Sequence, residues 1–588
     1  MTIKISSNPN ELLQQCFSFQ NNGQFEKAIK GYKKLLGIYP NNPQLLGSLG
    51  MALLQSNNLK EGCLTLEKSL RADPNQPNTI FNLALGYEKQ NRFQDALLEF
   101  DKAIKLQPRF NEVYIQKVKV LIKLKEFESA INIADQIILT NPTTSIALLD
   151  KGICLHNLNK DSDAIEIYNQ ALIYDKENPA LLNARGISEL ALNKFEDAIL
   201  SFKNSIQVNG ANPQPWNNLG LALHRLNKFD AAIASFDKAI TINSKYADAY
   251  SNRGRSLQAL KQIEKALDDF NMAIKIESRH PDAHWNKALL KILIGNYEEG
   301  WKLYEWRWKS FSEKWARHYQ QPLWLGEESL KAKSILIYPE QGYGDFIQFF
   351  RYIPMLQALG AKVILETPTP LVHLINTSSS EVEIIESGKN LPKFDFQCPI
   401  MSLPLALRTK IESIPDVFPY LSVAPEKIKL WQTRLGTKTN KRIGIAWSGS
   451  KDHKNDHNRS ITLSQLSSLF EMPFEFHSLQ KEIRESDQFY FEKSSIKDHQ
   501  ADINEFSDTA ALIENIDLIV TVDTAIAHLA GSLKKTFILL LPYNSDYRWM
   551  LDSKSTPWYP SAIILRQGEI GSWSKVISEL KTILLTLT

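Results

Sequence analysis

The sequence has few cysteines, no long apolar run and no excess of charge. Its four cysteines are far apart and form no CxxC pair, which argues against a disulfide framework or a zinc knuckle. Lys plus Arg number 68 and Asp plus Glu 65, so the formal charge of +3 gives no reason to expect nucleic acid or an anionic membrane as a partner. No run approaches the roughly 18 apolar residues that span a bilayer, and the first residues lack the apolar core of a signal peptide. We therefore expect a cytoplasmic protein without an integral membrane segment.

What the sequence does contain is an internal period. A step of 34 residues from Ala28 meets only small residues, at Gly62, Ala96, Ala130, Ala164, Ala198, Ala232, Ala266 and Gly300. The same step from Cys16 again meets mostly small residues, and from Tyr32 it meets mostly aromatic ones. A chain of 588 residues is long enough for two to four domains, and this period marks the first of them.

The period is that of a helical repeat. A small residue on each of two helices, with an aromatic residue one turn later, lets the two helices cross closely. The pattern resembles the tetratricopeptide repeat and covers residues 9–310 in about nine repeats. This resemblance implies an all-α superhelix with a long concave groove that holds a partner.

Four asparagines occur two residues before the small position of the first helix, namely Asn82, Asn218, Asn252 and Asn286. In long arrays of this family, for example in protein O-GlcNAc transferases, asparagines so placed line the groove and hold the backbone of an extended peptide. The alternative is that they satisfy polar groups between neighbouring repeats. On the first interpretation the array binds a protein or peptide.

Tryptophans crowd the end of the array. Five of the twelve in the chain fall within residues 301–324, at Trp301, Trp306, Trp308, Trp315 and Trp324. Indole rings can stack on sugars, but a solenoid must also cover its last apolar face. We therefore interpret residues 311–332 as a Trp-rich cap and linker.

After residue 333 the pattern changes to short apolar runs that alternate with helical segments, which is typical of parallel sheets with crossover helices. The runs are residues 334–339, 362–368, 442–447, 474–479, 517–522 and 536–541. They form two sets, which predict a Rossmann-like half over 333–420, a linker over 421–440 and a second half with a final helix over 441–588. Two such halves form a cleft at the carboxyl ends of their strands, where ligands bind.

The first half carries polar residues at its first strand end, in YPEQGYGDFIQFFRY. Gly342 and Gly344 allow a sharp turn, and Asp345 begins a helix, either as a cap or as an acid presented to a ligand. The dinucleotide fingerprint GxGxxG is incomplete, because Ile347 replaces its third glycine. Glu366 could still take the place of a ribose-binding acid, which leaves a nicotinamide enzyme as a minor alternative.

The second half carries cations and hydroxyl groups in the loop after residues 442–447, among them Ser448 and Arg459, and this composition suits an anion such as phosphate. His453 and His457, with the aspartates beside them, could instead bind a metal.

The second candidate position in this half is TVDTAIAHLAG, at the end of the buried run 517–522. Asp523 or Thr524 caps the following helix, whose free amides suit a diphosphate. His528 lies one turn inside that helix and could add a hydrogen bond to a phosphate or ribose, or could be a satisfied core histidine.

Together EQGYGDFIQFFRYIP, GIAWSG, NDHNRSI, SLQKEIR, DTAIAHLAG, LLPYNSDYRWMLD and STPWYP resemble glycosyltransferase family 9, the heptosyltransferases, over residues 333–588. The resemblance implies a GT-B fold, a nucleotide-sugar donor and Asp345 as general base. It implies a donor-diphosphate site at Asp523, Thr524, Ala525 and His528, where Ala525 replaces a glycine of the family. Arg459 is the candidate for the cation near the phosphates. Gly342, Gly344, Ser448 and Lys481 complete the candidate donor-binding residues.

The sequence thus predicts an inverting, metal-independent glycosyltransferase, hexosyl- or heptosyltransferase-like, that uses a nucleotide-sugar as substrate and needs no cofactor. Its acceptor is expected to be a protein or peptide held by the repeats. Two alternatives stay open. One is a non-catalytic scaffold with a degenerate GT-B domain, and the other is a transferase that acts on a glycan or a lipid-linked acceptor.

Overall fold

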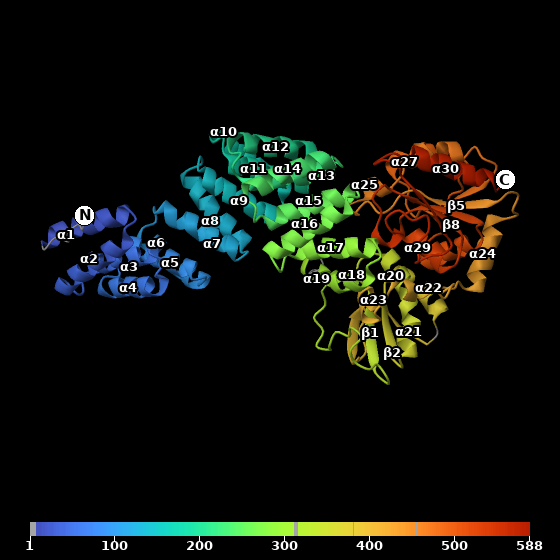
Figure 1. Cartoon of the computed structure of the whole chain (residues 1–588), viewed down its shortest axis with the longest axis horizontal. Helices are drawn as coiled ribbons and strands as arrows, with labels where there is room; N and C mark the ends of the chain where they lie inside the picture. Colours follow the sequence, from blue (N-terminus) through green and yellow to red (C-terminus); the bar gives the residue numbers. More distant parts are fainter. Residues whose placement is uncertain (1–7, 311–315, 380, 454, 588) are drawn as a thin grey trace. The chain divides into compact units, whose positions relative to one another are not determined.

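The computed structural model describes residues 8–310, 316–379, 381–453 and 455–587. It divides into two compact units, Met1–Ser244 and Lys245–Thr588 (Figure 1). In its described residues the first unit contains only helices and the turns between them, and the second unit contains further repeat helices followed by two parallel α/β halves. The fold class expected from the sequence is therefore confirmed. Among the described residues, no helix is long and apolar enough to cross a membrane.

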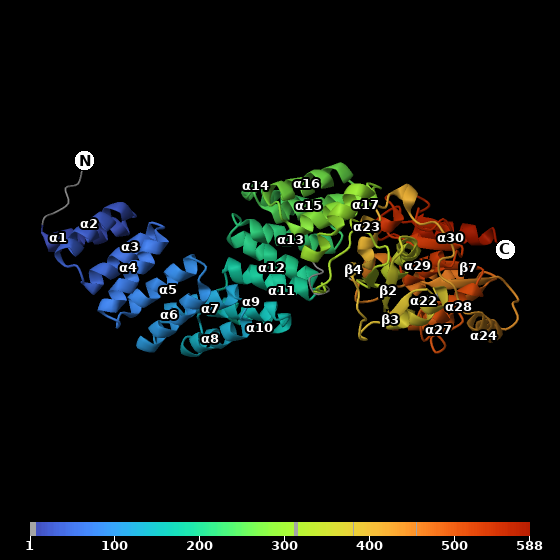
Figure 2. The same cartoon turned by 90° about the horizontal axis from the view of Figure 1, so that it is seen from below.

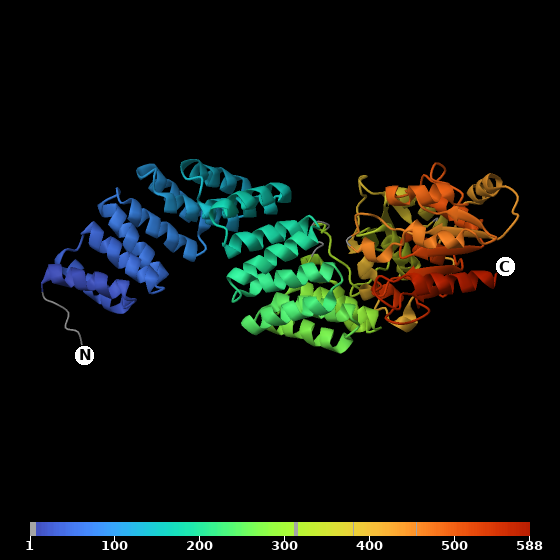
Figure 3. The ribbon, with the colours of Figure 1, turned by 90° about the horizontal axis from the view of Figure 1, so that it is seen from above.

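The first unit is a series of helix pairs that pack on one another in chain order (Figure 2), and the order can be followed by colour in Figure 3. The helices are α1 Pro9–Asn21, α2 Phe25–Ile38, α3 Pro43–Gln55, α4 Leu59–Ala72, α5 Pro77–Lys89, α6 Phe93–Leu106, α7 Asn111–Lys123, α8 Phe127–Thr140, α9 Ser145–Asn157, α10 Asp161–Tyr174, α11 Pro179–Ala191, α12 Phe195–Val208, α13 Pro213–Arg225 and α14 Phe229–Ile242.

The small residues of the period allow the close crossing that the sequence predicts. A Cβ atom added to Gly152 would lie 2.2 Å from the ring of Tyr168, and one added to Gly220 would lie 2.5 Å from the ring of Phe236. In both pairs the glycine is on the first helix of a repeat and the aromatic ring is on the second. Any larger residue at the glycine would therefore force the two helices apart.

A second feature recurs with the same step of 34 residues and is not evident from the small residues. The chain turns from the first helix of each repeat to the second through one residue with positive φ, at Gly23, Asn57, Asn91, Lys125, Asn159, Asn193, Asn227, Lys261 and Gly295. Glycine adopts this conformation freely, and asparagine does so more readily than most other residues. These residues set where each first helix stops.

The second unit begins with the last repeat helices. They are α15 Ala247–Ala259, α16 Ile263–Ile276, α17 Pro281–Leu293, α18 Tyr297–Tyr304 and the short α19 Arg307–Ser310. Two parallel sheets follow, in the order β3-β2-β1-β4 and β6-β5-β7-β8-β9. Their strands are β1 Ser334–Tyr338, β2 Lys362–Thr367, β3 Glu383–Glu386, β4 Phe396–Pro399, β5 Arg442–Ala446, β6 Glu475–Ser478, β7 Leu518–Val522, β8 Phe537–Leu541 and β9 Ala562–Arg566.

All six strands that the sequence predicts are present, each within one residue of the expected range at either end. Strands β3, β4 and β9 were not expected. Of these, β3 is half-buried along its whole length and carries a glutamate at each end, so its apolar signal is short.

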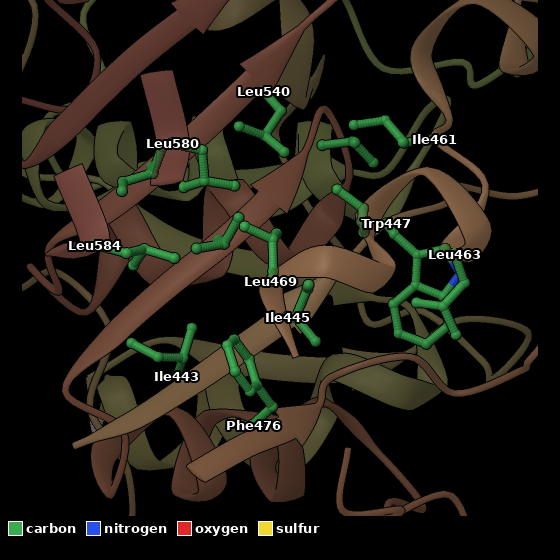
Figure 4. Packing of buried hydrophobic residues seen from close by; sticks show 14 of the residues in the cluster. Ile443, Ile445, Trp447, Ile461, Leu463, Leu469, Phe476, Leu540, Leu580 and Leu584 are labelled. Carbon is green, nitrogen blue, oxygen red and sulfur yellow. The ribbon is translucent and has the colours of Figure 1, made fainter. Parts of the chain in front are cut away.

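Helices join the strands and cover the sheets. They are α20 Tyr343–Phe349, α21 Ile353–Ala358, α22 Val372–Ser378, α23 Leu403–Ala406, α24 Pro425–Leu435, α25 Asp456–Arg459, α26 Leu463–Leu466, α27 Glu485–Lys493, α28 Phe506–Glu514, α29 Ala525–Ser532 and α30 Ser574–Leu585. The final helix α30 packs Leu580 and Leu584 into the core of the second half, together with Ile443 and Ile445 of β5 and Leu540 of β8 (Figure 4). Each such buried side chain contributes about 1.5–3 kcal/mol.

The repeat helices of the second unit are joined to both halves by an aromatic cluster. Trp301 of α18 is 1% exposed, and its ring lies 6.2 Å from that of Phe349, 6.0 Å from that of Tyr547 and 6.4 Å from that of Trp558. Phe349 belongs to the first half, and the other two rings belong to the second. This packing accounts for Trp301 without any bound sugar.

The other tryptophans of the crowded segment also have packing partners. Trp324 is buried, and its indole N–H donates to the carbonyl of Glu328. Trp306 stacks on His284 with ring centroids 3.8 Å apart, and the indole N–H of Trp308 donates to a Glu305 carboxylate oxygen. Trp315 lies outside the described residues.

A buried ion pair lies next to the aromatic cluster. Arg307 of α19 is fully buried and donates two hydrogen bonds of 2.8 Å to the two carboxylate oxygens of Glu340, in the loop after β1. It also donates to Glu305 and Ser402. The end of the repeats is thereby fixed to the loop that leads into α20.

Candidate active site

The turn after β1 positions Asp345 by its own backbone. The N–H of Gly342 donates to Oδ2 of Asp345 at 2.9 Å, so this carboxylate does close the first turn of α20. Phe346, Ile347 and Phe349 are fully buried and hold the other face of the helix in the core. Oδ2 of Asp345 therefore acts as a helix cap, and Oδ1 is left for other contacts.

Arg548 occupies that second oxygen. This arginine lies in a short helical turn, η7 Tyr547–Trp549, after β8 of the second half, and its Nη2 donates to Oδ1 of Asp345. Its Nη1 donates to Asp546 at 2.7 Å and its Nε to the side chain of Gln348 at 2.5 Å. One buried guanidinium thus links the candidate base in the first half to the second half.

The electrostatics of Arg548 follow from these neighbours. Burial would lower the pKa of its guanidinium, but the carboxylates of Asp546 and Asp345 more than offset that effect and keep the pKa well above its usual range. Arg548 was not among the predicted site residues. Two signals could have found it, its place in the motif LLPYNSDYRWMLD and its position after β8, at the carboxyl edge of the sheet.

Helix α29 begins as the sequence predicts. Thr524 is its N-cap residue, and its hydroxyl oxygen accepts a hydrogen bond from the N–H of Ile526 at 3.3 Å. Ala525 is the first helical residue, where the resemblance would place a glycine. Of the two candidate caps, Thr524 is therefore the one that serves.

The turn of the first half and helix α29 of the second half touch. A Cβ atom added to Gly344 would lie 2.6 Å from Cδ2 and 3.3 Å from Nε2 of His528, and 3.4 Å from the Cα of Ala525. Only a glycine at residue 344 allows this approach. Asp345 and His528, which are 183 residues apart in the chain, are thereby brought to the same place.

His528 is almost fully buried at 5% exposure. Its Nδ1 lies 2.9 Å from the hydroxyl oxygen of Tyr559, and its ring packs against that of Trp549 at 5.5 Å. Burial, together with the positive charges of Arg548 and Arg351, holds the pKa of His528 well below its usual range. The imidazole is therefore neutral at physiological pH.

Asp523 and Arg459 also lie together. Nη1 of Arg459 donates to the backbone carbonyl of Asp523 at 3.0 Å, and the guanidinium lies so close to Gly449 that a Cβ atom there would be 2.4 Å from Nη2. Burial and the nearby carboxylate of Asp546 raise the pKa of Asp523, while Arg459 opposes that shift. The predicted cation therefore contacts the predicted diphosphate motif.

Two other predicted donor-binding residues have local partners. The hydroxyl oxygen of Ser448 is buried and accepts from the side-chain amide of Gln480 at 2.8 Å. The ammonium group of Lys481 donates to the backbone carbonyls of Ile503 and Gln500. The structure thus gives Lys481 a backbone contact and does not bond it to the other predicted residues.

The four asparagines of the repeats are all half-buried. In the first unit, Nδ2 of Asn218 donates to Asn183 of the preceding repeat at 3.0 Å, and in the second unit Nδ2 of Asn286 approaches the hydroxyl of Ser251 at 3.4 Å. These two asparagines therefore form contacts between repeats. Asn82 in the first unit and Asn252 in the second occupy the same position of the period.

Two alternative sites follow from the sequence, a ribose-binding acid at Glu366 and a metal site at His453 and His457, and the structure shows the partners of Glu366 and His453. Glu366 is bound by both terminal nitrogens of Arg317, so its carboxylate has a structural partner. Nδ1 of His453 accepts from the N–H of Asn455 at 3.2 Å. In the ranges that the structure describes, no group of three or more His, Cys, Asp or Glu side chains could hold a metal ion.

Comparisons with known proteins agree with this architecture. Tetratricopeptide repeat models match residues 18–77, 77–110, 213–246 and 247–280. The model of glycosyltransferase family 9 (heptosyltransferase) matches residues 504–578. The chain carries tetratricopeptide repeats in its N-terminal part and a glycosyltransferase family 9 domain at its C-terminal end.

The family 9 match covers part of the candidate site. Residues 504–578 contain Asp523 to His528, Arg548 and Tyr559, whereas Asp345 and Arg459 lie outside the matched segment. The family comparison therefore reaches the segment that contains the donor motif and does not reach the candidate base.

A curated relative and several solved structures are also similar to parts of this chain. Protein FlbA of Caulobacter vibrioides is 24% identical over 328 residues, which are 51% of this chain and 54% of FlbA, so the match spans about half of that protein. A tetratricopeptide repeat protein from Parabacteroides merdae is 17% identical with a TM-score of 0.37, and the match covers 42% of this chain and 98% of that one. YrrB, described as having an unusual peptide-binding site, is 23% identical with a TM-score of 0.27, over 32% of this chain and 98% of YrrB.

Proposed function

We propose that the protein transfers a sugar from a nucleotide-sugar donor to an acceptor, with inversion and without a metal ion. The observation that supports this most directly is the contact between Gly344 and His528, which brings the turn that carries Asp345 against the start of the diphosphate motif. Both lie beyond the carboxyl ends of parallel strands, where α/β sheets bind ligands. In this proposal the nucleotide-sugar is a substrate, and no cofactor is used.

The proposed reaction begins at Asp345. Its carboxylate takes the proton of the acceptor nucleophile, which attacks the anomeric carbon while the bond from that carbon to the diphosphate oxygen breaks. General base assistance contributes about 10² to 10⁴ in rate. Gly342 and Arg548 hold the two carboxylate oxygens in a fixed orientation, so little reorganisation is needed before the proton moves.

The negative charge then grows on the leaving nucleoside diphosphate. The first amides of α29, capped by Thr524, and the guanidinium of Arg459 are the proposed partners of that charge. Removal of one such donor from an oxyanion site costs roughly 10² to 10³ in rate. Ser448, Lys481 and Asp523 stay in the proposal as donor-side residues.

The acceptor is proposed to be a protein or peptide that the repeat array holds through Asn82, Asn218, Asn252 and Asn286. The hexosyl or heptosyl character of the donor and a cytoplasmic location also belong to this proposal. The tetratricopeptide matches support a role in protein interaction, since such arrays bind their partners along an extended surface.

The test is the release of nucleoside diphosphate from a panel of nucleotide-sugars, in lysate of a strain that lacks the protein. Asp345→Asn keeps an oxygen for the Gly342 N–H but removes the base, so turnover should fall about 10² to 10⁴-fold. Asp416→Asn, an exposed carboxylate of the same region, is the matched control and should turn over normally.

The outcomes separate the alternatives. Labelled donor that ends on a protein band supports the proposed acceptor, and label on a glycan or lipid fraction supports the other transferase. If wild type and Asp345→Asn release diphosphate equally, the catalytic role of Asp345 is wrong. If no donor is consumed and none binds in titrations, the protein is a scaffold with a degenerate domain.

A further inference from the structure

A chain of polar groups, of which Tyr420 is half-buried and the others are buried, leads from Arg351 to the imidazole of His528. Arg351 is 3% exposed, and its Nη2 donates to the hydroxyl oxygen of Tyr420 at 3.1 Å. The Tyr420 hydroxyl donates in turn to the hydroxyl oxygen of Tyr559 at 3.4 Å. The Tyr559 hydroxyl lies 2.9 Å from Nδ1 of His528.

The direction of these hydrogen bonds decides which nitrogen of His528 carries the proton. Arg351 can only donate, so Tyr420 accepts from it and has its own hydrogen left for Tyr559. Tyr559 accepts that hydrogen and has its hydroxyl hydrogen left for Nδ1. In the reverse direction Tyr420 would accept twice, and its own hydrogen would lose the Tyr559 acceptor at 3.4 Å. The positive charge of Arg351 also favours hydroxyl hydrogens that point away from it.

The other ring nitrogen lies at the proposed site. Nε2 of His528 lies 3.3 Å from the position that a Cβ atom of Gly344 would occupy, directly before Asp345 in the chain. We propose that Tyr559 is a positioning residue that fixes His528 as the Nε2–H tautomer, so that a hydrogen-bond donor lies beside the Gly344–Asp345 turn. The ligand group suited to this donor is an oxygen with negative charge, and its assignment to the donor diphosphate rests on the proposed function.

Three features keep the imidazole in this state. Its ring is enclosed by those of Trp549 at 5.5 Å and Tyr559 at 5.6 Å, which hinders rotation. Its pKa is held well below the usual range by burial and by Arg548 and Arg351, so the ring carries a single proton. A neutral histidine with one nitrogen accepting from a hydroxyl must present N–H at the other nitrogen.

The test uses the full chain labelled with ¹⁵N-histidine, with the signals of residue 528 assigned from their loss in His528→Gln. The expected spectrum shows the proton on Nε2 and an Nδ1 signal shifted by an accepted hydrogen bond. Tyr559→Phe should move the Nδ1 signal, and Tyr420→Phe should move it less in the same direction. Tyr352→Phe, a fully buried tyrosine outside this chain of hydrogen bonds, should leave it unchanged.

A wild-type proton on Nδ1, a doubly protonated ring, or an unchanged Nδ1 signal in Tyr559→Phe would each overturn the assignment. The spectrum does not depend on turnover, so it separates this proposal from the proposed function. Once a donor is known, Tyr559→Phe should lower kcat several-fold, as expected for one hydrogen bond. Its KM for the acceptor should not change, because Tyr559 reaches the site only through His528.

Discussion

At the scale of single residues, Asp345 shows why a sequence cannot choose between a cap and a base. One oxygen accepts from the Gly342 N–H, as a cap does, and the other is held by Arg548 from the other half of the domain. The two interpretations are therefore compatible, because a carboxylate has several acceptor positions. The decisive partner lies 203 residues away in the chain, beyond the reach of any local pattern.

Replacement of Arg548 should be costly for stability. Arg548→Met removes the hydrogen-bond donor of Asp345, Asp546 and Gln348. Loss of one partner of a buried ion pair costs about 3–5 kcal/mol of unfolding free energy. Arg548→Lys keeps the charge but loses the planar fork, so it should fall between wild type and Arg548→Met. Urea unfolding measures both, and equal stability of all three proteins would contradict the assigned network.

A second residue-scale prediction concerns pH. Burial raises the pKa of Asp150 to about 6, with Lys119 opposing, at the repeat position where Asn82 and Asn218 also lie. An acid whose pKa is higher in the folded state than in the unfolded state destabilises the folded state as pH rises from about 4 through 6. Above that range the loss for a shift of this size is about 3 kcal/mol of unfolding free energy.

Asp150→Asn should therefore raise the thermal unfolding midpoint at pH 8 and leave it nearly unchanged at pH 4. Asp135→Asn, which removes a partly exposed carboxylate paired with Lys151, is the control and should not stabilise the protein at pH 8. A gain for Asp150→Asn that is equal at both pH values would indicate a cause other than titration.

At the scale of elements, the turn between the helices of a repeat depends on one left-handed residue. Asparagine or glycine stands at most of these positions, but Lys125 and Lys261 adopt the same conformation with φ of 61° and 56°. A residue other than glycine in this conformation costs roughly 1–2 kcal/mol. That cost comes from the Cβ atom, which lies too close to the following carbonyl oxygen.

Lys125→Gly should consequently stabilise the first unit, by about 0.5–1 kcal/mol after the greater entropy of the unfolded glycine is subtracted. Lys119→Gly places the same substitution inside α7 and should destabilise by a similar amount. Thermal unfolding of the two variants distinguishes them by sign. Destabilisation by Lys125→Gly would mean that its side chain has a role in the turn.

The helices and strands differ in how well they could be predicted from the sequence. The repeats and six strands could be predicted because their apolar periods are long or uninterrupted. Strands β3 and β4 could not, since EIIE and FQCP contain few consecutive apolar residues, whereas the apolar run in AIILR of β9 was a signal that was missed. In the candidate site, residues within one motif were found, whereas Arg548 and Tyr559 were missed because only tertiary packing brings them to Asp345 and His528.

At the scale of the whole molecule, the last repeat helices are part of the unit that contains the candidate site. Arg307 and Glu340 form a buried ion pair beside the Trp301 cluster, and burial raises the pKa of Glu340 even with the arginine next to it. An unpaired buried charge at this position would strongly destabilise the unit. The contact between the repeats and the α/β halves is therefore sensitive to replacement of either partner alone.

Arg307→Met should lower the free energy of unfolding of this unit by about 3–5 kcal/mol, because Glu340 loses its partner. The double variant Arg307→Met with Glu340→Leu should recover much of that loss, since no unpaired charge is left in the core. A double variant that is less stable than Arg307→Met would show that the pair itself stabilises the contact. Tryptophan fluorescence of the Trp301 cluster is the measure.

The placement of the boundary between the two compact units, between Ser244 and Lys245, has a consequence for how such a protein can change over generations. Duplication or loss of a 34-residue repeat ahead of Lys245 alters the length of the array while the buried contacts of Trp301 and Arg307 are kept. The repeats that contain α15 to α18 have no such freedom, because their last helices share a core with both sheets. The number of repeats is thus expected to vary at the beginning of the array. The repeats at its end are expected to be inherited together with the transferase region.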